Sequence, residues 1–187
     1  MKPHVRARFG VFAECLLVGV WIAVASVPVV TLPAALAAGA AHLRRWTGEV
    51  EGGWREFAAD LRSAARRGWL VGLAGLAALA LLWTDLAIVR AGLPGGRFAG
   101  TVGVLAALAL TVTVLRACTA WCPGASWRVL LKAAARRTLG DPAGSLLVVC
   151  GLAVIAVSAW FAAPLAAPAL GMLVAATLAA ERRVLTR

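Results

Sequence analysis

Long stretches without a charged residue alternate with short clusters of arginine along the chain. Residues 142–180 contain no Asp, Glu, Lys or Arg, and shorter uncharged stretches occupy 68–84 and 98–115. A helix of the 39 residues in 142–180 would be about 58 Å long, whereas the hydrocarbon core of a bilayer is about 30 Å thick. The pattern therefore predicts two membrane spans in the longest stretch and one span in each of the others.

Prolines divide the two longest apolar stretches. Pro164 and Pro168 predict a turn between two spans, because proline removes a backbone donor and disfavours helix before it. In the first stretch, Pro28 and Pro33 leave two solutions open. One is a full span at about 9–27 followed by a short returning helix at about 33–46, and the other is a single kinked span.

The distribution of basic residues favours the returning helix. With it, 17 of the 19 Lys and Arg residues fall on one side of the membrane, against 14 without it. The positive-inside rule then places both termini in the cytoplasm. A signal peptide cleaved after Ala37 is disfavoured, because the apolar region is too long for one and contains Glu14.

Composition agrees with this membrane assignment. The chain is 62% hydrophobic and 14% charged, whereas soluble domains are about half apolar and about a quarter charged. We predict an all-α fold, a polytopic transmembrane helical bundle that forms a single integral membrane domain over residues 1–187. It has five full spans plus the short returning helix, at about 9–27, 33–46 (short), 68–90, 98–120, 144–161 and 165–180.

The net charge of +11 does not indicate nucleic-acid binding. Its arginines lie between apolar stretches, where basic residues orient spans and contact anionic headgroups. The partner predicted by this pattern is the lipid bilayer.

Two basic connectors, at about 53–67 and 126–138, have the apolar spacing of amphipathic helices. Such helices lie in the membrane interface, with the apolar face toward lipid and the cationic face toward phosphates or an acidic partner. The first connector is the stronger candidate for a docking surface, which would consist of Trp54, Phe57, Leu61, Arg62, Arg66 and Arg67.

Glu14 and Asp85 are the acids most clearly embedded in apolar segments. A charged group inside a bilayer costs several kcal/mol unless it is paired or hydrated, so such residues are functional candidates. Glu14 is expected level with Arg116, which leaves an ion pair between them open. Asp85 is expected near the opposite end of its span, within reach of Arg90 or Arg97, and we expect it to be the more sensitive to substitution.

The sequence shows no catalytic, cofactor-binding or metal-binding constellation. Its cysteines form no CxxC pair. Cys118 and Cys122 share a helix face, but the only histidines, His4 and His42, are distant from them in sequence. A zinc site needs about four such ligands close together. We therefore expect no enzymatic activity, no cofactor and no metal.

Residues 10–90 carry a series of features in a fixed order: a proline-marked turn, a small-residue helix, an Arg-Trp pair, Gly-Glu, an aromatic amphipathic segment and Asp-Leu. These are Pro28, Pro33, Ala34, Ala35, Arg45, Trp46, Gly48, Glu49, Trp54, Phe57, Asp85 and Leu86. The series resembles the YesL-like family of bacterial integral membrane proteins. The second half departs from that pattern, because residues 121–124 read Trp-Cys-Pro-Gly where the family has an aromatic-Pro-Leu stretch.

The resemblance implies a protein of the bacterial cytoplasmic membrane without an established activity, in a family often encoded near genes for carbohydrate uptake. The function expected from it is that of a non-enzymatic accessory or assembly component linked to a sugar uptake transporter. The alternative is a small secondary transporter or channel that uses Asp85 or Glu14 as its intramembrane ionisable group.

Reporter fusions at Pro3 and at Arg187 test the predicted topology. We expect a cytoplasmic readout from both, because only that arrangement places 17 of the 19 basic residues on one side. A periplasmic readout at Pro3 would instead support five spans without a returning helix.

Overall fold

The computed structural model describes residues 3–48, 52–91, 96–161 and 171–178, and this part consists of helices joined by short turns and loops. The expected all-helical class is therefore confirmed, and the described residues contain no β-strand. The elements are α1 (Pro3–Ala25), the short 3-10 helix η1 (Val29–Thr31), α2 (Leu32–Thr47), α3 (Trp54–Arg90), α4 (Gly96–Thr119), α5 (Trp127–Gly140) and α6 (Pro142–Phe161). Residues 171–178 form a further helical segment.

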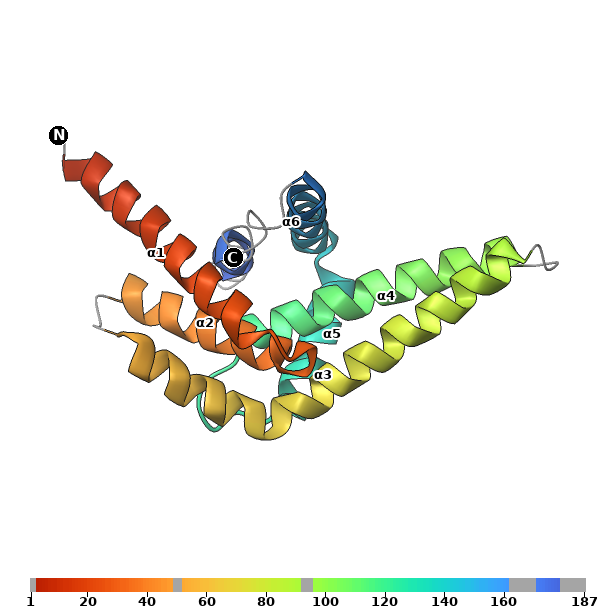
Figure 1. The fold of residues 1–187 in the computed structure, drawn as a ribbon, viewed down its shortest axis with the longest axis horizontal. Coiled ribbons are helices and arrows are strands. Elements are labelled where there is room, and N and C mark those ends of the chain that lie inside the picture. Colours follow the sequence, from red (N-terminus) through yellow and green to blue (C-terminus); the bar gives the residue numbers. More distant parts are fainter. Residues whose placement is uncertain (1–2, 49–51, 92–95, 162–170, 179–187) are drawn as a thin grey trace.

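The proline-marked turn makes α1 and α2 a helical hairpin. After α1 ends at Ala25, η1 reverses the chain, and Pro33 lies in the first turn of α2, where its missing N–H costs nothing. Figure 1 shows α2 returning alongside α1. This arrangement corresponds to the returning helix rather than to a single kinked span.

The hairpin packs closely because residues 33–43 of α2 are mainly alanine and glycine. Residues 33–43 are all buried, and α2 contacts α1, α3 and α4. At Gly39, an added Cβ would lie 2.6 Å from the Cδ1 atom of Ile22 and 3.1 Å from Val18. Small side chains allow this approach, as they do in membrane helix pairs generally.

One continuous helix, α3, replaces two elements that were expected to be separate. It runs for 37 residues, so the predicted interfacial helix at 53–67 and the predicted span at 68–90 are parts of the same helix. The boundary expected near Gly68 was wrong because a glycine alone, without proline, does not end a helix. Figure 1 shows α3 bent, with its first part beside α2 and its second part beside α4.

Fewer helices qualify as membrane spans than the five expected. Within the described residues, α3 and the 98–119 part of α4 are long and apolar enough to cross a bilayer. The pair formed by α5 and α6, bent by 103°, adds a third if it is counted as one span. In α1 the apolar part with described side chains, Ala13–Ala25, is shorter. Half of the predicted span at 165–180, residues 165–170 and 179–180, lies outside the described residues.

A tight turn followed by a buried indole joins α4 to α5. The Ala125 N–H donates to the Cys122 carbonyl (3.0 Å), and Gly124 has a φ of 85°, which a type II turn requires at its third position. Trp127, the first residue of α5, donates from Nε1 to the Ala64 carbonyl of α3 (3.3 Å). The helix expected at 126–138 is thus observed as α5 and is anchored to α3.

Two glycines one turn apart on α3 provide a matched test of this packing. A Cβ at Gly72 would overlap the backbone carbonyl of Val30 in η1, whereas one at Gly75 would meet nothing within 4 Å. We expect Gly72→Ala to lower the free energy of unfolding by about 1–3 kcal/mol through overpacking. Gly75→Ala should raise it by about 0.5–1 kcal/mol, the gain in helix propensity.

Denaturation of the detergent-solubilised variants measures both effects. Equal effects of the two substitutions would contradict the packing of α3 on η1.

Candidate functional site

A partly buried acid–imidazole pair joins α1 to α2. The Nε2 atom of His42 lies 2.7 Å from Oε1 of Glu14, although the two residues are 28 positions apart in sequence. His42 is 1% exposed, and the side chain of Glu14 is 21% exposed. The acid that the sequence places within an apolar segment therefore has a partner, and that partner is a histidine for which the sequence predicted no role.

An ion pair lies three residues further along α2. The Arg45 guanidinium donates from Nη2 to Oδ2 of Asp60 on α3 at 2.6 Å, and Asp60 is buried. Sequence reasoning missed this pair too. A signal was present, because Asp60 falls at helical spacing between Phe57 and Ala64, on the face that α3 turns to the bundle.

Together these four residues form a polar cluster, Glu14, His42, Arg45 and Asp60, that joins α1, α2 and α3. Two of its buried nitrogens, Nδ1 of His42 and Nε of Arg45, have no hydrogen-bond partner among the residues that the structure describes. Both face Gly52, at 3.7 and 3.5 Å from the position of a Cβ there. A neutral imidazole that donates through Nε2 to Glu14 presents Nδ1 as an acceptor, whereas an imidazolium donates from both nitrogens.

Aromatic rings cover the polar cluster. The Trp21 ring centroid lies 5.1 Å from that of His42, 5.6 Å from that of Trp54 and 5.4 Å from that of Phe57. Phe57 is completely buried, whereas Trp54 is 49% exposed. The apolar stripe of the first part of α3, formed by Trp54, Phe57 and Leu61, was expected to face lipid. It packs largely against the α1–α2 hairpin instead, and Leu61 is partly buried against the same core.

The C-terminal end of α2 also holds the end of α4. The guanidinium of Arg44 donates to the carbonyls of Thr119 and Trp121. These carbonyls have no acceptor role within α4 because the helix ends there, and a cation at a helix C-terminus is favoured by the helix dipole. Successive residues Arg44 and Arg45 thus connect α2 to α4 and to α3.

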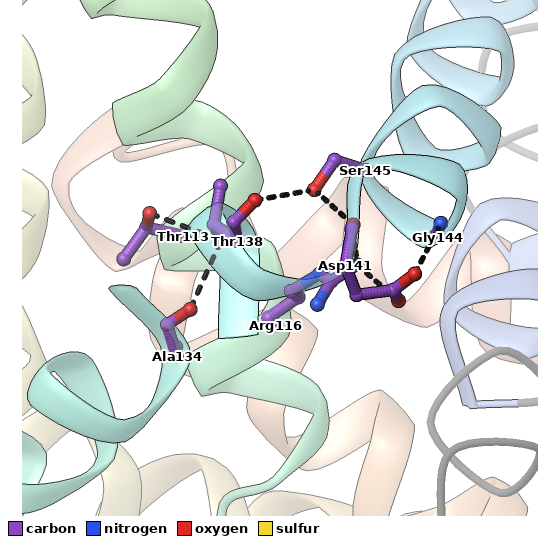
Figure 2. A network of polar contacts seen from close by, with 7 residues as sticks. All are labelled: Thr113, Arg116, Ala134, Thr138, Asp141, Gly144 and Ser145. Atoms are coloured by element: carbon purple, nitrogen blue, oxygen red, sulfur yellow. Dashed lines mark hydrogen bonds and ion pairs between the residues drawn. The ribbon is translucent and has the colours of Figure 1, made fainter. Parts of the chain in front are cut away.

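Arg116 has a different partner from the one left open by the sequence. It is 3% exposed, and its Nη2 lies 3.1 Å from Oδ2 of Asp141, at the corner between α5 and α6 (Figure 2). The pairing with Glu14 does not occur, because Glu14 is engaged by His42. Asp141 lies close to α4 because the chain bends sharply between α5 and α6.

Asp141 also caps α6. Its Oδ1 accepts the Gly144 N–H at 3.0 Å, and the Ser145 hydroxyl donates to the Asp141 carbonyl at 2.9 Å (Figure 2). The Ser145 hydroxyl lies 3.1 Å from the Thr138 carbonyl at the end of α5 as well. These bonds stabilise the sharp corner and fix the acid beside Arg116.

Asp85 lies in the contact between α3 and α4. Its Oδ2 atom is 2.9 Å from the position that a Cβ on Gly103 would occupy, so the glycine makes room for the carboxylate. Within the described part of the chain, Asp85 has no hydrogen bond or ion pair, and Arg90 does not reach it. The side chain of Arg97 lies outside the described residues.

Comparisons with known proteins yield no match: no protein family, curated protein or solved structure is similar to this chain. The resemblance to the YesL-like family therefore stays a prediction.

A double-mutant cycle tests the acid–imidazole pair. We expect His42→Ala to lower the free energy of unfolding by about 2–4 kcal/mol, because it leaves the Glu14 carboxylate without its partner among apolar side chains. The effect of Glu14→Gln should shrink in the His42→Ala background, since the interaction that it weakens is already gone.

Asp85→Asn serves as the comparison, and we expect a change within about 0.5 kcal/mol because no contact is lost. These contacts therefore predict a larger loss of stability from substitution of Glu14 than from substitution of Asp85, whereas the sequence predicted that Asp85 is the more sensitive of the two. Additive effects of Glu14→Gln and His42→Ala in the thermal or chemical denaturation would contradict a direct pair.

Proposed function

We propose that the protein is a non-enzymatic, multi-pass protein of the bacterial cytoplasmic membrane that acts as an accessory or assembly component of a carbohydrate uptake system. In this proposal the chain has five spans plus the returning helix, and both termini are cytoplasmic. The observation that carries it is the basic face on the first part of α3.

This basic face consists of Arg55, Arg62, Arg66 and Arg67, all exposed. None has an ion pair within the described part of the chain. The opposite face of the same turns is occupied by Phe57, Asp60 and Ala64, which are buried against the bundle. Because the apolar stripe is already packed, the basic face is left for a partner.

The basic face is also rigid, which favours recognition. The cluster of Glu14, His42, Arg45 and Asp60 ties this part of α3 to α1 and α2. A preformed surface loses little conformational entropy on binding, and complementary charge accelerates encounter with an acidic partner. The half-exposed Trp54 at its edge supplies the kind of aromatic anchor that contributes strongly to interfaces.

The link to carbohydrate uptake rests on the resemblance of residues 10–90 to the YesL-like family. The basic face supports an acidic partner surface, and in this proposal that surface lies at the cytoplasmic side of a membrane complex. Membrane-bound subunits of a sugar uptake transporter meet that description.

A second candidate function is that of a small proton-coupled transporter or channel, and the Glu14–His42 pair favours it. Ionisable residues inside membrane bundles commonly mark proton or ion pathways. Flux of sugars or protons into proteoliposomes that is abolished by Glu14→Gln would support this candidate. Asp85, between α3 and α4, would be the second position to test.

Affinity purification in mild detergent tests the accessory role. We expect the wild-type protein to recover subunits of a sugar uptake transporter, and the variant Trp54→Ser/Arg62→Glu to recover them about tenfold less, since it removes the anchor and reverses a charge. Arg128→Glu is the matched control, because Arg128 is an exposed arginine on α5 outside the basic face.

Both variants should insert into the membrane in wild-type amounts. Equal recovery of the transporter subunits by the wild type and by Trp54→Ser/Arg62→Glu would contradict docking through α3.

A further inference from the structure

A pocket of about 190 Å³ lies between α3 and the link from α4 to α5. Two arginines, two indoles and three small residues line it: Arg66, Arg67, Trp121, Trp127, Ser63, Gly124 and Ala125. The side chains therefore offer positive charge and hydroxyl and guanidinium donors above an aromatic floor, and no acid lines the pocket.

The floor of the pocket is held in place from three sides. Trp121 and Trp127 are 2% and 5% exposed. Trp127 is bonded to the Ala64 carbonyl, and its ring packs 3.2 Å from the Cβ position of Gly68, where any larger residue would displace it. The Trp121 carbonyl accepts a bond from Arg44. The pocket is thus a consequence of the packing of α2, α3 and α5 rather than of a loose surface loop.

The two arginines are available to a ligand. Both guanidinium groups are without an ion pair or hydrogen bond in the described part of the chain, and both residues are exposed. The Ser63 hydroxyl lies one helical turn before Arg66. Adjacent guanidinium forks and a hydroxyl are the donors that bind the oxygens of a phosphate, and arginine does so in bidentate fashion.

The position of the pocket along α3 and α4 corresponds to the headgroup level of a bilayer. The uncharged stretch of α3 begins at Gly68, directly after Arg67, and α4 ends at Thr119, two residues before Trp121. The pocket residues on α3 and those after α4 therefore lie at the same end of the α3–α4 hairpin, where its apolar surface stops. Trp69, 47% exposed beside this end, is typical of the membrane interface.

We propose that this pocket binds the phosphate of an anionic phospholipid headgroup at the cytoplasmic surface of the membrane. Its volume is about six times the roughly 30 Å³ that one water occupies, enough for a phosphate with its ester atoms. The inference rests on the proposed placement of this end of α3 at the cytoplasmic interface. It divides the basic face, since Arg66 and Arg67 hold lipid and leave Arg55 and Arg62 to a protein partner.

Native mass spectrometry of the purified protein in neutral detergent tests the proposal without any partner protein. The protein is titrated with phosphatidylglycerol and, separately, with phosphatidylcholine of the same chain length. We expect phosphatidylglycerol to bind in preference, and Arg66→Gln/Arg67→Gln to weaken that binding about tenfold or more. The matched control, Arg55→Gln/Arg62→Gln, removes the same charge from the same helix outside the pocket and should bind within about twofold of the wild type.

Competition with inorganic phosphate and with glycerol phosphate separates the two sources of a phosphate group. We expect neither to displace the lipid at millimolar concentration. Displacement by either compound would overturn the assignment to a lipid and identify a soluble phosphate ester as the ligand. Equal weakening by the two double variants would overturn the pocket itself, because total charge would then account for the binding.

Discussion

The burial of α2 on all sides is the constraint on which the rest of the structure depends. A helix surrounded by three others must carry small side chains, and residues 33–43 are mostly alanine with Gly39 at the closest approach to α1. This close approach has a second effect at the end of α2. It brings His42, Arg44 and Arg45 within bonding distance of α1, α4 and α3 in turn.

Each of these polar side chains at the C-terminal end of α2 is stabilised by a partner on another helix, and the packing of the apolar side chains brings that partner within bonding distance. In surroundings of low dielectric constant an unpaired ion is costly, and a paired one holds its helices in a single register. The same argument applies to Arg116, which is buried and meets Asp141 at the corner of α5 and α6. These pairs make the basic end of the bundle rigid, and the arginines that remain outside it are therefore presented on a fixed surface.

Because α3 is one continuous helix, it joins the polar end of the bundle to the apolar α3–α4 hairpin. Its first part packs on α2 and carries the basic face, while its second part pairs with α4 through an apolar surface. Trp127 packs against Gly68 where these parts meet, and the pocket beside Arg66 and Arg67 lies there. A partner or lipid bound at this point would contact the element that also forms the membrane hairpin.

The sequence alone determined the helical class and the clustering of arginine between apolar stretches, and it favoured the returning helix after Pro33 over a single kinked span, because helix period, proline and charge act locally. It also marked Glu14 and Asp85 as charges embedded in apolar segments, and it left open an ion pair between Glu14 and Arg116. Only the tertiary structure decided that Glu14 meets His42, that Arg116 meets Asp141, and that Phe57 is buried while Arg66 and Arg67 stay exposed. Those outcomes depend on contacts between segments far apart in the chain, whose approach is set by the packing of α2 and not by any local pattern.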